Sequence, residues 1–333
     1  MQDSNENYYQ EKDSRSYYYN RRKKPLFLIN ILLFILTFFT TTLAGVGWQN
    51  ADPYQLDNFY LGITYSVLIM SVITAHEFGH YFAARFHKID VTLPYYIPFP
   101  FLFLNPFGTM GAVIKMLSPN HSRKSLFDVG VAGPIAGWIV TIVFLVIGFS
   151  TLPPVDYLYK IHPEYSNTGI PTSGLTFGYN LVFFILEKLF SLKSSVFIPP
   201  MNEIYHYPFL CVGWFGLLIT SLNMMPVGQL DGGHISYTMF GEKKSNLTGS
   251  IIFYVLLFFG ILGILPFLGI NISIGSLNWL VWALLVKFVV KTKHPPVCRD
   301  LHEPLGSTRI FLGWFSYFIF IVSFCPVPVS EGL

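Results

Sequence analysis

Charged residues are scarce in this sequence. Asp, Glu, Lys and Arg make up only 12% of its 333 residues, whereas 52% are hydrophobic and the mean hydropathy is +0.50. Soluble domains carry about 25% charged residues, so this chain has too little polar surface to cover a soluble fold. These proportions predict an α-helical polytopic membrane protein, with the lipid bilayer as its surroundings.

Cysteine and net charge are also low. Cys211, Cys298 and Cys325 lie far apart and form no C-x-x-C motif, which argues against a disulfide framework and a thiolate metal site. The formal net charge of +3 is too small to indicate a nucleic-acid partner. The sequence therefore fits neither a disulfide-stabilised or thiolate-metal protein nor a nucleic-acid-binding protein.

Long apolar runs predict about seven transmembrane helices. A polar tail, 1–24, precedes the first span at 25–48. The remaining spans are predicted at 61–86, 126–149, 208–225, 249–270, 277–290 and 310–326, so that 249–326 holds a C-terminal group of spans.

Basic residues indicate the orientation of these spans. The tail ends in four consecutive basic residues, and most other Lys and Arg lie in loops on the same side of the predicted membrane. The positive-inside rule therefore predicts a cytoplasmic N-terminus. No Arg- and Ser-rich transit peptide precedes the first span, which favours a bacterial inner (cell) membrane, with an organellar membrane as the weaker alternative.

Two further stretches are not expected to span the membrane. The segment 91–116 is apolar but carries four prolines, which break helices, so it predicts a short membrane-associated β-hairpin with a strand from Gly108 to Met116. The segment 151–207 is predicted to be an external loop, with an amphipathic helix at 178–190 on the membrane surface.

The predicted second span contains the motif H-E-x-x-H. Because residues i and i+4 share one face of a helix, His76 and His80 can reach one metal ion. Glu77 can then act as the general base that activates water. Ionisable groups at membrane depth are costly, so the motif indicates a functional site; the alternative is that the three side chains satisfy one another in a helix bundle.

A zinc site needs a third protein ligand and an open position for water. Asp231 belongs to the polar segment 223–234 that closes the predicted fourth span, and it would lie toward the same, cytoplasmic half of the membrane as His76 and His80. Asp231 and Gly232 could instead form only a turn. The presence of H-E-x-x-H favours the ligand.

These motifs together resemble the site-2 protease family of intramembrane zinc metalloproteases. The resemblance rests on H-E-F-G-H at 76–80 and N-x-x-P-x-x-x-L-D-G-G at 223–233, with support from 108–112 and 132–134. It implies a catalytic core at 61–233 built on three helices, the second to fourth predicted spans, with the loop 151–207 included. That loop is short for a PDZ domain, and no C-terminal CBS domain is expected.

The resemblance also implies roles for individual residues. His76, His80 and Asp231 would hold one zinc ion per chain, Glu77 would be the general base, and Asn223 would help to stabilise the reaction centre. The implied reaction is hydrolysis of a peptide bond in membrane-anchored protein substrates near the cytoplasmic face, as in regulated intramembrane proteolysis. A regulatory membrane partner is left undefined.

A helical substrate has no exposed peptide bond and must become extended before it is cut. The predicted strand offers an edge on which an extended substrate could pair. This edge includes Gly108, Thr109, Gly111, Ala112 and Val113. The alternative is that the strand merely packs on the protein.

Two other functions would use the same residues. An ion or proton transporter could relay charge through the His, Glu and Asp cluster, but transporters often contain inverted repeats, and none is found in this sequence. A non-catalytic scaffold would be expected to have lost Glu77 or a ligand. In the third span, Gly133-x-x-x-Gly137 predicts close helix packing.

Overall fold

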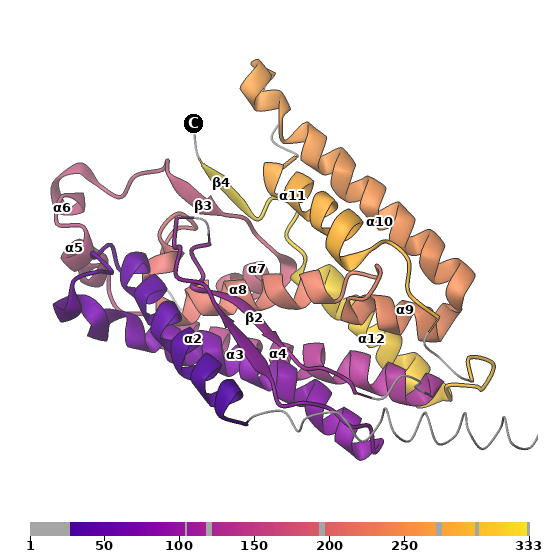
Figure 1. The fold of residues 1–333 in the computed structure, drawn as a ribbon. Helices are drawn as coiled ribbons and strands as arrows, with labels where there is room; N and C mark the ends of the chain where they lie inside the picture. Colours follow the sequence, from indigo (N-terminus) through magenta and orange to yellow (C-terminus); the bar gives the residue numbers. More distant parts are fainter. Residues whose placement is uncertain are drawn as a thin grey trace, which may run out of the picture.

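A computed structural model describes residues 27–103, 105–117, 122–192, 197–270, 275–296 and 300–331 (Figure 1). The predicted tail 1–24 and Cys298 lie outside the described residues. The described chain is mostly helical, as the sequence predicted.

Each of the seven predicted spans contains a helix. These helices are α2 (Phe27–Trp48), α3 (Phe59–Phe86), α4 (Arg123–Ser150), α8 (Pro208–Asn223), α10 (Glu242–Leu262), α11 (Leu277–Leu285, continued by a π-helical turn Val286–Val290) and α12 (Ser307–Ser323). Four helical segments are long and apolar enough to cross a membrane, namely Phe27–Trp48, Leu56–Phe86, Arg123–Ser150 and Glu242–Leu268. Whether the three shorter apolar helices also cross it stays a prediction.

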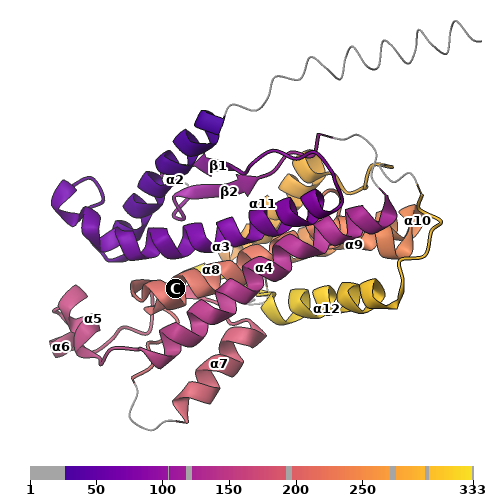
Figure 2. The same cartoon turned by 90° about the horizontal axis from the view of Figure 1, so that it is seen from below.

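The centre of the bundle is formed by α3, α4 and α8 (Figure 2). α4 packs between the other two helices, and α2 packs on α3. The Thr41 and Ser66 hydroxyls of α2 and α3 lie 2.6 Å apart. Large side chains such as Trp214, Phe215 and Leu145 are fully buried between these helices, so burial of apolar surface fixes their arrangement.

The predicted hairpin is present and lies against α2 and α3. Strands β1 (Tyr95–Pro98) and β2 (Thr109–Val113) pair antiparallel. Asn30 Nδ2 donates to the carbonyls of Leu93 and Pro94, and the Tyr96 hydroxyl lies 2.8 Å from that of Thr74 on α3. The strand begins one residue later than predicted, because Gly108 has a φ of +76° and cannot belong to an extended strand.

The loop 151–207 holds several short elements. They are α5 (Asp156–Ile161), α6 (Tyr165–Thr168), β3 (Leu175–Phe177), α7 (Leu181–Ser191) and a 3-10 turn, Ile204–His206. α7 is the helix that the sequence predicted at 178–190, and Asn180 caps its first turn by accepting from the Phe183 amide. The sequence did not indicate that β3 pairs with β4 (Val329–Glu331), a contact between distant segments.

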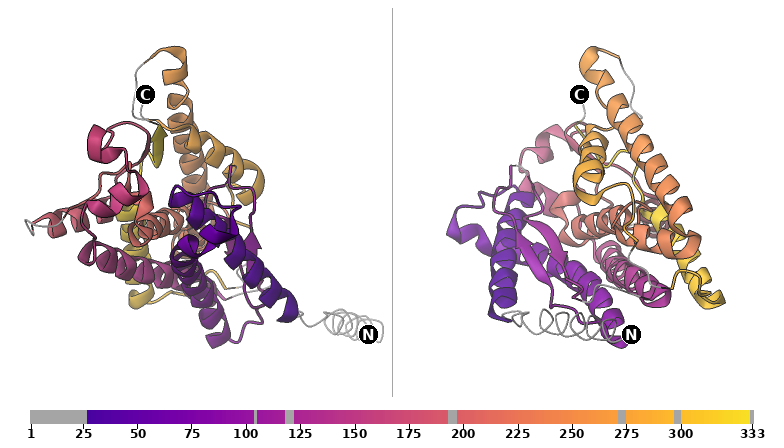
Figure 3. Two further views of the ribbon diagram at one scale, coloured as in Figure 1. Left: turned by 90° about the vertical axis from the view of Figure 1, so that its left-hand side faces the viewer. Right: turned by 45° about the vertical axis from the view of Figure 1, so that its right-hand side comes forward.

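Between the predicted fourth and fifth spans lies a helix that was not predicted. α9 (Asp231–Phe240) follows α8 after a turn segment, 224–230, and Asp231 is its first residue. The predicted core limit at residue 233 therefore falls inside a helix, since Asp231 begins a new element rather than ending the preceding one. α10 and α11 pack together on the side of the molecule away from α2 (Figures 1 and 3).

Candidate metal centre

Two helices bring the three predicted ligands together. His76 and His80 lie one turn apart on α3, and Asp231 lies at the start of α9. The two Nε2 atoms are 3.1 Å apart. Asp231 Oδ2 lies 3.3 Å from His76 Nε2, and Oδ1 lies 3.4 Å from His80 Nε2. Each residue thus points one ligand atom at a common point.

The spacing fits zinc. Bonds of 2.0–2.1 Å in a tetrahedral site place neighbouring ligand atoms about 3.3 Å apart, and the observed separations are 3.1 to 3.4 Å. Two imidazoles and one carboxylate are also a donor set that catalytic zinc sites use, with the fourth position left for water. The residues present therefore fit the metal that the sequence motif indicated.

A backbone carbonyl orients one of the imidazoles. His80 Nδ1 lies 2.7 Å from the carbonyl oxygen of Val129 on α4. Because a carbonyl only accepts, Nδ1 carries the proton and donates it, which leaves the Nε2 lone pair directed at the cluster. This partner has no signature in the sequence, because it is a main-chain atom of a different helix.

The G-x-x-x-G motif of α4 leaves room for the two imidazoles. A Cβ atom added to Gly133 would overlap the His80 ring, and one added to Gly137 would lie 3.2 Å from His76 Cβ. On α3, a Cβ atom added to Gly79 would lie 2.5 Å from the carbonyl oxygen of Ala132, so this glycine also allows the two helices to pack closely. The motif was expected to serve helix packing, and the structure shows that this packing is what seats the ligands.

Asp231 is placed by the segments on either side of it. A Cβ on Gly232 would overlap the Met224 carbonyl, so this glycine lets the start of α9 fold back on the turn 224–230. At the other end of α9, Arg123 Nε donates to the Thr238 carbonyl at 2.6 Å and Nη2 to that of Met239 at 3.3 Å. A cation at a helix C-terminus is favourable, so Arg123 fixes the helix that carries Asp231.

Glu77 lies between the metal ligands and the hairpin. Its side chain is buried, with 7% of its surface exposed, and the backbone of Ile114 lies close to its carboxylate. Ile114 directly follows β2. The candidate base is thus held at the end of the strand that was predicted to bind substrate.

The remaining predicted site residues are Asn223 and the residues of the predicted substrate strand, and none of them belongs to the ligand cluster. Asn223 is the last residue of α8 and is partly exposed, and no hydrogen bond joins it to the three ligands among the residues the structure describes. Thr109, Gly111, Ala112 and Val113 lie in β2, with Gly108 just before it. Within the described residues β2 pairs only with β1, so its second edge has no strand partner.

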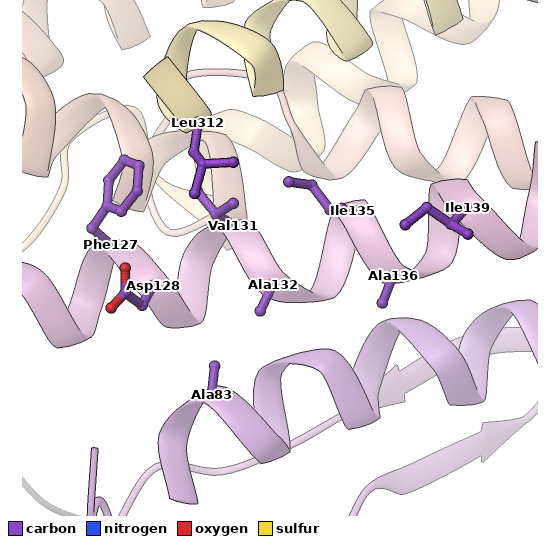
Figure 4. A pocket seen from close by; sticks show the side chains of 9 residues that line it. All are labelled: Ala83, Phe127, Asp128, Val131, Ala132, Ile135, Ala136, Ile139 and Leu312. Atoms are coloured by element: carbon purple, nitrogen blue, oxygen red, sulfur yellow. The ribbon is translucent and has the colours of Figure 1, made fainter. Parts of the chain in front are cut away.

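Ion pairs and an apolar groove surround the same end of the bundle. Arg309 of α12 donates to both carboxylate oxygens of Asp128 on α4, at 2.8 and 2.7 Å, and His87 Nε2 lies 2.7 Å from Oδ2. Beside this network a groove runs between α3, α4 and α12 (Figure 4). Its lining is apolar except for Asp128, and none of the three ligands borders it.

The buried His₂Asp cluster with an adjacent Glu, in a bundle of apolar helices, defines a membrane metallopeptidase type of site. A family model described as peptidase family M50 matches residues 64–264, which is more than half of the chain. The chain belongs to this family, which confirms the resemblance to site-2 proteases. The matched range includes every predicted ligand.

Curated relatives agree with this assignment. The chain is 28% identical over 277 residues to "Probable zinc metalloprotease EGY2, chloroplastic" of Oryza sativa subsp. indica, which covers 81% of this chain and 44% of the relative. It is 26% identical over 321 residues to "Probable zinc metalloprotease EGY1, chloroplastic" of Arabidopsis thaliana, covering 90% and 53%. The chain thus spans about half the length of these relatives. No solved structure matches it significantly.

Proposed function

We propose that this protein is an intramembrane zinc metalloprotease that hydrolyses a peptide bond in membrane-anchored protein substrates. The observation that carries the proposal is the convergence of two imidazole Nε2 atoms and one carboxylate, separated by 3.1 to 3.4 Å, beside the buried carboxylate of Glu77. Family membership and the names of the relatives support the same activity.

Each residue has a defined task in this proposal. His76, His80 and Asp231 hold one zinc ion, which when bound polarises the scissile carbonyl and acidifies water. Glu77 accepts the proton of the attacking water on its carboxylate and delivers it to the nitrogen of the leaving peptide segment. Asn223, at the end of α8, donates a hydrogen bond to the oxygen that becomes negative.

The free edge of β2 is proposed to bind the substrate. An extended segment that pairs along this edge runs toward Ile114, whose backbone contacts Glu77. The pairing would unwind a helical substrate and bring one of its peptide bonds to the general base. The strand has the length for this role, with five residues from Thr109 to Val113.

The orientation proposed from the basic loops places this cluster toward the cytoplasmic half of a multi-pass protein with seven spans. The three helices α3, α4 and α8, together with the start of α9, then form the catalytic core. For the compartment, the sequence favours a bacterial cell membrane, whereas the relatives are chloroplastic by name, which supports the organellar alternative. A regulatory membrane partner, as in regulated intramembrane proteolysis, belongs to the same proposal.

The test compares purified wild-type protein and Glu77→Gln in proteoliposomes that contain a membrane-anchored reporter substrate. Glu77→Gln should retain zinc and lose cleavage, because it removes the base and keeps all three ligands. Glu242→Gln, at an exposed position in the first turn of α10, is the matched control and should cleave normally. Asp231→Ala should lose the zinc ion of this centre as well as cleavage. Cleavage by Glu77→Gln at the wild-type rate would refute the proposal.

A further inference from the structure

A second cluster of metal-binding side chains lies in the loop 151–207. His162 follows α5, and Glu203 and His206 lie three residues apart around a 3-10 turn. One ligand atom from each of the three residues lies within 4.8 Å of the others. Glu203 and His206 are each only 1% exposed.

This cluster is far from the candidate metal centre. His206 Nδ1 lies 2.7 Å from the carbonyl of Trp48, the last residue of α2, close to where α3 begins. His76 lies further along α3, roughly 25 Å from its start at 1.5 Å per residue. The two clusters are therefore well separated along the bundle.

The hydrogen bonds of the two imidazoles assign their protons. The Trp48 carbonyl only accepts, so His206 Nδ1 donates to it and its Nε2 carries a lone pair. His162 Nδ1 lies 3.0 Å from the carboxylate of Glu164 and donates in the same way. The two Nε2 atoms nevertheless lie 3.0 Å apart, with both lone pairs directed at one point. A cation between them removes this repulsion.

Glu203 supplies the negative charge of the cluster. Its Oε1 accepts a hydrogen bond from the Tyr165 hydroxyl at 3.1 Å. Its Oε2 is buried, lies 3.4 Å from His206 Nε2, and has no hydrogen-bond partner among the residues the structure describes. An unpartnered buried carboxylate oxygen is costly, and a bound metal ion would compensate for that cost.

The spacing again agrees with a tetrahedral ion. The separations of 3.0 and 3.4 Å are close to the edge of about 3.3 Å that zinc–ligand bonds require. Each ligand is also oriented by a second partner, as in established zinc sites: Trp48, Glu164 and Tyr165 hold His206, His162 and Glu203 respectively.

We propose that His162, Glu203 and His206 form a second divalent-metal site, of the zinc type, separate from the proposed catalytic centre. Its role is structural. The Gln49 side-chain amide and the Tyr157 hydroxyl both donate to the His206 carbonyl, at 2.7 and 2.8 Å, so the turn is already tied to the end of α2 and to α5. Through His162, the ion also joins the segment after α5 to this turn, so that it holds the loop against the bundle.

The test is the zinc content of the purified full-length protein after gel filtration, measured by inductively coupled plasma mass spectrometry. Wild-type protein should hold two zinc ions per chain, and Asp231→Ala should keep one. His162→Ala should also keep one and should still cleave a reporter, which shows that it folds. The double variant His162→Ala/Asp231→Ala should hold none.

Two further variants make the result specific. Glu203→Gln keeps the size of the side chain and removes its charge, so in the Asp231→Ala background it should release the remaining ion. His302→Ala, an exposed histidine outside both clusters, should leave the zinc content unchanged. Cobalt bound to Asp231→Ala should give the visible absorption of a tetrahedral ion.

Either of two results would overturn the second site. Asp231→Ala without zinc would mean that a shared proton, rather than a metal, joins His162 and His206. Zinc retained by the double variant would place the ion elsewhere. The catalytic proposal is tested separately, by the cleavage activity of Glu77→Gln.

Discussion

Gly133→Ala is the sharpest test of how the metal centre is built, because it adds one methyl group and removes no ligand. The added Cβ would overlap the His80 ring. That ring is attached to α3, and its Nδ1 is held by the hydrogen bond to the Val129 carbonyl. It has to move by about 1 Å to restore ordinary contact distances of 3.5 Å or more.

The size of the effect follows from this displacement. Zinc–ligand distances tolerate only about 0.2 Å, so a shift of about 1 Å removes His80 from the ligand set. Disturbing the support of a zinc ligand costs about 10- to 100-fold in affinity, and loss of the ligand itself costs more. Proteolysis should fall by about 100-fold or more, since misplacement by 1 Å has that effect on catalysis. Intrinsic helix propensity works in the opposite direction, because alanine is favoured over glycine by about 1 kcal/mol in a helix.

A graded series of glycine substitutions supplies the control. A Cβ on Gly47 of α2 meets no atom within 4 Å, whereas one on Gly137 meets His76 Cβ at 3.2 Å. The zinc held by His76, His80 and Asp231 and the reporter cleavage should therefore be unchanged in Gly47→Ala, somewhat reduced in Gly137→Ala and largely lost in Gly133→Ala. Full zinc content and full cleavage in Gly133→Ala would refute the reasoning, because His80 could then not be where the structure places it.

Three further outcomes are expected. Arg123→Ala removes the donors to the last carbonyls of α9 and should lower the free energy of unfolding by about 2 kcal/mol, which thermal unfolding in detergent measures. Because α9 carries Asp231, zinc titration should also show weaker binding. Asp128→Asn weakens the bidentate ion pair with Arg309 and should lower the free energy of unfolding by about 1 kcal/mol, seen as a melting temperature lower by a few degrees. Cys325 is buried, with 1% of its surface exposed, so in a Cys298→Ser background native protein should resist maleimide until it is denatured; rapid labelling of Cys325 would contradict its burial.

The sequence predicted those parts of the fold that depend on local pattern. Apolar runs located the helices, four prolines located the hairpin, and the i, i+4 spacing placed His76 and His80 on one face of α3. Asp231 was indicated less directly, because a ligand from another helix has no fixed spacing to the first two. Its assignment needed the resemblance to a family, and its position at the start of α9 became visible only in the structure.

The pairing of β3 with β4, the Val129 carbonyl beneath His80, and the contact of Ile114 with Glu77 were not predicted. Each joins segments that lie far apart in the chain, and all three use main-chain atoms that every residue possesses. A single sequence contains no pattern from which such contacts can be deduced, since their existence depends on how the helices pack.

The two histidine clusters differ in how a backbone carbonyl becomes available to an imidazole. Both orient an imidazole through a bond from Nδ1 to a backbone carbonyl, at 2.7 Å in each case. Trp48 ends α2, and the last carbonyls of a helix lack partners within it, so the Trp48 oxygen is free to accept from His206. Val129 lies inside α4, where a side chain normally shields the carbonyl of the preceding turn. The missing side chain of Gly133 allows the His80 ring to approach that carbonyl. In this protein the middle of a helix can therefore orient His80 only because a glycine follows the accepting residue by one turn, whereas the end of α2 orients His206 without a glycine.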